Sequence, residues 1–120
     1  IIWGSGNPSR EFLHVDDMAK ACIYVMENIS ANKLYKSLKI SHLNIGSGVE
    51  ITIKDLAELI KYHSGYTGKL IFDKTKPDGV SRKLLDSSII LSLGWVPKIS
   101  LEDGVKMTLN NFNTKYLLDS

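Results

Sequence analysis

Apolar residues recur at steps of three and four along three stretches of the chain, which is the spacing of a helix with one buried face. The first stretch predicts a helix over 16–28, whose inner stripe comprises Met18, Cys22, Val25, Met26 and Ile29. The second predicts a helix over 53–64, with an inner face of Ile53, Leu56, Ala57, Ile60 and His63. The third predicts a helix that begins at residue 101, with a buried face of Leu101, Val105, Thr108, Leu109 and Phe112.

Shorter apolar runs between these stretches predict strands. They lie at 10–15, 42–45 and 69–72, and the chain opens on a strand or its approach at 1–3. A short helix is expected from Asp86 to Leu93, halted by Gly94, and a polar surface loop is expected over 30–41. Short strands that alternate with helices indicate the α/β class.

Residues that cap helices support these boundaries. Asp16 or Asp17 is expected to cap the first helix, because a carboxylate accepts from the free N–H groups of a first turn. Thr52 and Asp55 have the spacing of a capping box, and Gly65 is a good helix stop. We expect order from 1 to about 113 and a tail over 114–120.

Composition restricts the class of protein. The 120 residues are 43% hydrophobic and 23% charged, which is enough for a core, and the net charge of +2 is too small to indicate nucleic acid or an anionic membrane as main partner. The single cysteine suits a reducing compartment, and no leader or membrane-spanning run is visible, so a cytoplasmic location is expected. Because the chain begins at Ile1 within an apolar run, we expect it to be part of a longer protein.

The sequence offers no complete catalytic or cofactor motif. Two Gly-Ser-Gly turns, at 4–6 and 46–48, each give only the first two glycines of a dinucleotide fingerprint. The second turn precedes the predicted helix over 53–64, whose N–H groups could hold an anion. The three histidines lie far apart, and Tyr24, Tyr62, Tyr66 and Tyr116 each lack a lysine four residues later. No residue is therefore predicted to be catalytic, to bind the cofactor or to bind a metal.

What remains is a set of side chains suited to a charged ligand rich in hydroxyl groups. The Arg10 guanidinium can pair with phosphate oxygens, Trp3 offers a flat apolar face, and Asp78 can accept hydrogen bonds from sugar hydroxyls. Lys76 and Arg82 could add positive charge beside a diphosphate. Each has a plainer alternative: an ion pair of Arg10 with a neighbouring carboxylate, a core position for Trp3, and solvent exposure for the lysine-bearing loop.

Several runs together resemble the GDP-L-fucose synthase family of extended short-chain dehydrogenase/reductases. They extend from residue 1 to about residue 112 and comprise Trp3-Gly4-Ser5-Gly6, Arg10-Glu11-Phe12-Leu13-His14-Val15-Asp16-Asp17, Asn44-Ile45-Gly46, Lys76-Pro77-Asp78-Gly79 and Arg82-Lys83-Leu84-Leu85-Asp86. The element that starts at Arg10 occurs in many such enzymes. The runs before and behind it make the resemblance more specific.

The resemblance implies a role for this chain as the C-terminal, substrate-binding part of an α/β enzyme that a Rossmann-fold domain completes. That N-terminal dinucleotide-binding domain is expected to lie outside the chain. Trp3, Arg10 and Asp78 are implied to contact a GDP-sugar, with Lys76 and Arg82 as neighbours. The full enzyme is implied to use NADP, to form a homodimer, and to convert GDP-4-keto-6-deoxymannose to GDP-L-fucose by 3,5-epimerisation and 4-reduction.

Two other readings stay open at this point. One is a related NAD-dependent nucleotide-sugar epimerase or dehydratase. The other is a ligand-binding module with no catalysis. The acid–base and reduction residues of the resembled enzymes lie outside the matched runs, so Cys22 and His14 do not inherit those roles, and the chain alone is expected to be inactive.

Overall fold

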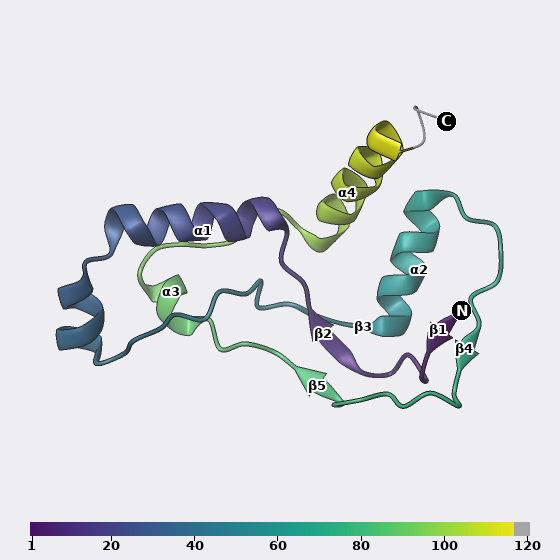
Figure 1. Ribbon diagram of the computed structural model, residues 1–120, viewed down its shortest axis with the longest axis horizontal. Helices are drawn as coiled ribbons and strands as arrows, with labels where there is room; N and C mark the ends of the chain where they lie inside the picture. Colours follow the sequence, from purple (N-terminus) through teal and green to yellow (C-terminus); the bar gives the residue numbers. More distant parts are fainter. Residues whose placement is uncertain (117–120) are drawn as a thin grey trace. The chain divides into compact units, whose positions relative to one another are not determined.

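The computed structural model describes residues 1–116, which form two compact units. The first unit combines residues 1–10, 50–83 and those from 100 onward, and the second combines residues 11–49 and 84–99. Helices and short strands alternate along the chain, which confirms the predicted α/β class (Figure 1). Among the described residues, no helix is long and apolar enough to cross a membrane.

The strands of the first unit are very short. Strand β1, Ile2–Trp3, pairs in parallel with β4, Phe72–Asp73. A separate sheet has the order β3-β2-β5 and is built from Glu50–Thr52, Ser9–Glu11 and Arg82–Lys83, with β2 and β5 parallel. The two sheets thus pair residues near the start of the chain with residues 72–73 and 82–83, about seventy positions later.

Two helices complete the first unit, α2 at Ile53–Ser64 and α4 at Leu101–Tyr116 (Figure 1). They pack on each other, and Nε2 of His63 lies 3.3 Å from a carboxylate oxygen of Glu102. The predicted start and stop of α2 are confirmed: the Thr52 side chain accepts from the Asp55 N–H, and Gly65 ends the helix with a φ of 68°. On α4, the predicted inner positions Thr108 and Phe112 are exposed.

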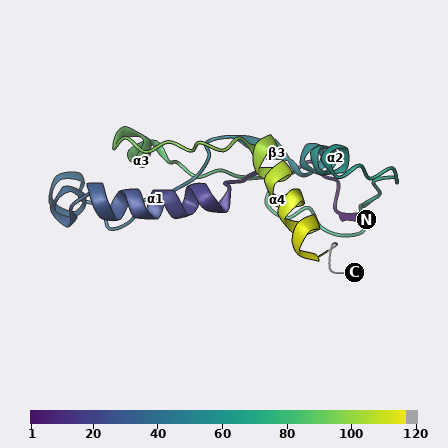
Figure 2. The ribbon, with the colours of Figure 1, turned by 90° about the horizontal axis from the view of Figure 1, so that it is seen from above.

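The second unit contains α1, Val15–Asn28, the π-helical turn η1, Lys33–Leu38, and α3, Ser88–Ser92. A short connection joins α1 to η1 at the C-terminal end of α1 (Figures 1 and 2). The prediction of a polar surface loop over 30–41 was therefore wrong in part, because the segment contains η1, although most of these residues are exposed as expected.

The core of the second unit is small. It comprises Ala21, Ile90 and Trp95, with partly buried Leu13, Tyr24, Val25 and Ile45 packed around them. The stripe predicted to be buried on α1 was wrong for Met18, Cys22 and Met26, which are exposed. The helix is apolar on more than one face, so spacing alone could not show which face meets the core.

The cap of α1 also differs from the prediction. His14 precedes the helix, and its side chain accepts from the Asp16 N–H at 3.2 Å. Asp17 is 1% exposed and accepts instead from the backbone N–H groups of Lys98 and Ile99, both at 2.8 Å. Neither Asp16 nor Asp17 is thus the capping residue.

Three predicted strands differ from the observed ones. The run over 10–15 forms a strand only to Glu11, the run over 69–72 pairs only from Phe72, and residues 42–45 form no strand. A strand exists only where a neighbour supplies hydrogen bonds, and the Asn44 side chain instead donates to the Asp86 carbonyl. The side-chain carboxylate of Asp86 accepts from the N–H of Ser88, the first residue of α3.

Candidate functional site

Two loops of the first unit lie together because the strands before them are paired. Trp3 is in register with Asp73, so the loop that follows β1 and the loop that follows β4 leave the sheet at the same edge. The Asp73 carbonyl accepts from the N–H of Gly4 at 2.9 Å and from that of Lys76 at 3.1 Å. One backbone oxygen therefore joins the two loops at their base.

The carboxylate of Asp78 forms a second connection between the same two loops. The Ser5 N–H donates to Oδ1 of Asp78 at 2.5 Å, and the Ser5 hydroxyl donates to Oδ2 at 2.7 Å. The pKa of Asp78 lies below its usual value because the Ser5 hydroxyl, and after it the Ser5 N–H, donate to this carboxylate. Asp78 is thus an ionised acceptor whose two oxygens each already hold one hydrogen bond.

Trp3 and Lys76 meet beside this contact. Nζ of Lys76 lies 5.5 Å from the centre of the Trp3 ring, within the range of a cation–π contact, and Trp3 is 72% exposed. The alternative of a core position for Trp3 is therefore wrong. An exposed aromatic face beside a lysine is suited to a planar or anionic ligand.

Arg10 on β2 also lies close to this loop. Its side chain is half-buried, and Nη1 donates to the Ser9 carbonyl at 2.7 Å. A β-carbon built on Gly79 would lie 3.9 Å from Nη2 of Arg10, so the guanidinium passes close to the residue after Asp78. The structure thus brings Trp3, Lys76, Asp78 and Arg10 around a single loop, residues 76–79.

Arg82 has a partner within the protein. Its Nε and Nη2 donate to the two carboxylate oxygens of Glu50 at 2.7 and 2.6 Å, so the ion pair is bidentate. The pKa of Glu50 is lowered, mainly because Arg82 donates to it, and the pKa of Arg82 is raised by the same contact. Strands β3 and β5, which carry these residues, flank β2 and therefore Arg10.

The second Gly-Ser-Gly turn precedes α2, as predicted, but does not lead directly into it. Strand β3 separates it from α2, and the Gly48 N–H donates at 2.6 Å to the carboxylate of Glu11. The first N–H groups of α2 donate elsewhere: Ile53 to the Pro8 carbonyl at 3.0 Å, and Lys54 to the Gly6 carbonyl at 2.9 Å. The suggestion that this turn holds an anion at a helix start is thus wrong.

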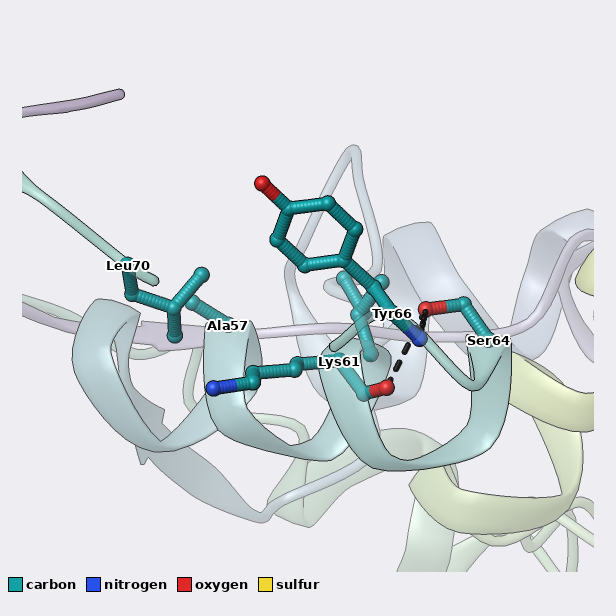
Figure 3. A pocket seen from close by; sticks show the side chains of 6 residues that line it. Ala57, Lys61, Ser64, Tyr66 and Leu70 are labelled. Atoms are coloured by element: carbon teal, nitrogen blue, oxygen red, sulfur yellow. Dashed lines mark hydrogen bonds between the residues drawn. The ribbon is translucent and has the colours of Figure 1, made fainter. Parts of the chain in front are cut away.

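An open hollow lies elsewhere in the first unit, at the C-terminal end of α2 (Figure 3). Its volume is about 520 Å³, and it is lined by Ala57, Ile60, Lys61, Ser64, Tyr66 and Leu70. Among its lining residues, the Ser64 hydroxyl donates to the Lys61 carbonyl at 3.1 Å and accepts from the Tyr66 N–H at 3.4 Å (Figure 3). None of the predicted ligand residues lines it.

Within residues 1–116, no three side chains of the kinds that bind metals lie close enough together to hold an ion. Two functional candidates escaped the sequence prediction. Ser5 lies in a Gly-Ser-Gly turn, and glycines are typical of places where the backbone approaches another group closely. Glu11 is the carboxylate next to Arg10 in the sequence, and it accepts from the N–H groups of Gly48 and Leu85.

Comparison with known proteins identifies relatives of the chain. Residues 1–46 match the model of the NAD dependent epimerase/dehydratase family. Over 108 residues the chain is 56% identical to the putative GDP-L-fucose synthase 2 of Arabidopsis thaliana, an alignment that covers 90% of this chain and 30% of that protein. It is 50% identical over 113 residues to the GDP-L-fucose synthase of Escherichia coli K12, covering 93% of this chain and 35% of that protein.

A solved structure agrees with these sequences. The GDP-L-fucose synthetase of Naegleria fowleri, determined with NADP bound, superposes with a TM-score of 0.83 at 26% identity, over 96% of this chain and 34% of that one. The chain thus spans about a third of the length of the relatives that it matches. The resemblance to GDP-L-fucose synthases inferred from its motifs is confirmed, as is its relation to α/β epimerases and reductases.

Proposed function

We propose that this chain, which is similar over nine-tenths of its length to GDP-L-fucose synthases, is the GDP-sugar-binding part of such an enzyme. The complete enzyme converts GDP-4-keto-6-deoxymannose to GDP-L-fucose by 3,5-epimerisation and 4-reduction. It uses NADP, acts in the cytoplasm and forms a homodimer. This chain is its C-terminal part, and a dinucleotide-binding domain outside the chain precedes it.

One observation carries the proposal: Trp3 and Arg10 both lie beside loop 76–79, which carries Asp78 and is distant from them in the sequence. Arg10 offers a planar fork of donors to the diphosphate. Asp78 offers acceptor lone pairs to sugar hydroxyls, since a carboxylate has about four and Ser5 occupies two. The open face of Trp3 and the charge of Lys76 complete a surface for a nucleotide.

The roles of these residues are binding and orientation. Holding a reactant in the correct geometry can remove roughly 7–11 kcal/mol of a barrier, because the entropy of alignment is lost on binding. NADP, held mainly by residues outside this chain, supplies the hydride that reduces C4. We assign Arg82 a structural role, because its guanidinium is engaged with Glu50.

The experiment is turnover by the complete protein that contains this chain. With GDP-4-keto-6-deoxymannose present, we expect oxidation of NADPH and formation of GDP-L-fucose. The R10A variant should raise KM by about 10- to 100-fold, the range that loss of a hydrogen bond to a charged group predicts. The K36A variant changes an exposed lysine on η1 and should leave KM unchanged.

Two results would overturn the proposal. Interconversion of UDP-sugars through bound NAD, with no consumption of NADPH, would establish a related epimerase instead. Binding of GDP by the complete protein without any turnover would establish a ligand-binding module.

A further inference from the structure

Ser5 holds the Asp78 carboxylate through two hydrogen bonds. One donor of Ser5 is fixed in the backbone, the other lies on its side chain, and each reaches a different oxygen of Asp78. The χ2 torsion of an aspartate normally has a broad distribution. Two such bonds restrict it, so the plane of the Asp78 carboxylate cannot rotate freely. The remaining lone pairs of both oxygens then keep a constant direction.

Ser5 itself is held on both sides. The N–H of Gly4 donates to the Asp73 carbonyl, and the carbonyl of Gly6 accepts from Lys54 at the start of α2. Both glycines have φ near 80° and are buried, so the backbone at this turn has a shape that other residues rarely adopt. The position of Ser5 is therefore fixed by the strand pair and by the helix before any ligand arrives.

The turn also lacks room for a different arrangement. A β-carbon at Gly4 would collide with the Asp78 carboxylate, and one at Gly6 would lie 3.1 Å from the β-carbon of Lys54 and against the Phe72 ring. The loop that carries Asp78 is thus pressed against the loop that carries Ser5. The same loop holds Lys76 beside Trp3 and passes Arg10 at Gly79.

We propose that Ser5 is a positioning residue for GDP-sugar binding: it aims the Asp78 carboxylate at the ligand and keeps loop 76–79 in place between Trp3 and Arg10. This inference rests on the proposed function. Ser5 contacts the ligand through Asp78 only and takes no part in hydride or proton transfer.

The test uses the complete enzyme with GDP-4-keto-6-deoxymannose and compares S5A, S5T and S41A. S5A removes one hydroxyl donor and keeps the backbone donor, so we expect KM to rise about 3- to 10-fold with kcat nearly unchanged. S5T keeps a hydroxyl and should restore most of the affinity. S41A makes the same chemical change at an exposed serine of the second unit and should match the wild type.

A pH profile separates positioning from a general structural effect. The Ser5 hydroxyl lowers the pKa of Asp78, so its removal should raise that pKa. As pH falls, the protonation of Asp78 weakens binding, and this loss should begin at a higher pH in S5A than in the wild type or S41A. Equal KM values and equal pH profiles for S5A and S41A would overturn the inference.

The D78A and R10A variants distinguish failure of this inference from failure of the proposed function. If both raise KM while S5A does not, only the role of Ser5 is wrong. If neither raises KM, the binding surface itself is wrong. S5C, with a weaker donor of similar size, should lie between S5A and the wild type and gives a second reading should S5A fold poorly.

Discussion

The carboxylate of Asp17 accepts a hydrogen bond from the N–H of Ile99, 82 positions later in the chain, at 2.8 Å. The N–H of Lys98 donates to the same oxygen at the same distance. Asp17 is almost fully buried, so these two bonds replace the water that the carboxylate would otherwise contact. They fasten the first turn of α1 to the segment just before α4 begins.

The D17A variant should therefore be strongly destabilised. It leaves two partly buried N–H groups without their acceptor, and a fully buried donor left unsatisfied costs about 1–3 kcal/mol. Urea unfolding followed by circular dichroism should show a total loss of about 2–4 kcal/mol. The matched control is D16A, which removes an exposed carboxylate one residue earlier. Equal unfolding midpoints for the two variants would contradict the role of Asp17.

The ion pair of Glu50 and Arg82 should make stability depend on pH on the acid side. The contact lowers the pKa of Glu50 below its ordinary value of about 4.5, mainly through the hydrogen bond from Arg82. A lowered carboxyl pKa stabilises the folded state fully above the ordinary value, and that contribution disappears as pH falls through the folded value. The pair is exposed to solvent, so the effect is modest and weaker in salt.

The measurement is the unfolding midpoint of the wild type and E50Q from neutral pH to about pH 3. The difference between the two proteins should shrink as the pH falls below 4.5. The E58Q variant changes an exposed glutamate on α2 and should show no such trend. A constant difference between wild type and E50Q at all pH values would contradict the assignment.

Gly4 and Gly48 provide a matched pair for separating backbone strain from crowding. Both have positive φ, 84° and 74°, so alanine costs about 1–2 kcal/mol of strain at either position. Only at Gly4 does the added β-carbon collide with Asp78, whereas nothing lies within 4 Å of one at Gly48. G4A should therefore unfold at a lower urea concentration than G48A, and it alone should raise KM for the GDP-sugar.

The Glu11 carboxylate should protect two backbone N–H groups of the second unit from exchange. Its Oε1 accepts from Gly48 at 2.6 Å, and its Oε2 accepts from Leu85 at 3.1 Å. In E11A, hydrogen exchange measured by NMR should become faster at both positions, because neither keeps its acceptor. E27A removes an exposed glutamate on α1 and serves as the control. Unchanged exchange at Gly48 and Leu85 would rule out this bridge.

The helices of this chain could be predicted more accurately than its strands, and the reason is physical. Thr52 and Gly65 mark the ends of α2 through contacts within a few residues, so the local sequence contains the whole signal. Strands of two or three residues exist only opposite a distant partner, as Trp3 does opposite Asp73. Nothing near residues 42–45 indicates that such a partner is missing there.

At the candidate site, too, features of single residues could be predicted, whereas contacts between distant residues could not. Side-chain chemistry and a family resemblance predict Trp3, Arg10 and Asp78 as ligand contacts, and the structure gathers them at one loop. The contact that joins Ser5 to Asp78 spans 73 positions and could not be read from either residue alone. The bidentate pairing of Arg82 with Glu50 was missed for the same reason.

Each of the two units is assembled from separated stretches, and this has a consequence for how the protein is made. Ala21 completes its core only with Ile90 and Trp95, and α2 finds α4 only after residue 100 has been added. A nascent chain that has reached residue 83 therefore holds two half-finished cores. Apolar side chains that belong to these cores, Ala21 and Val25 among them, are then open to chaperones until Ile90 and Trp95 have been added.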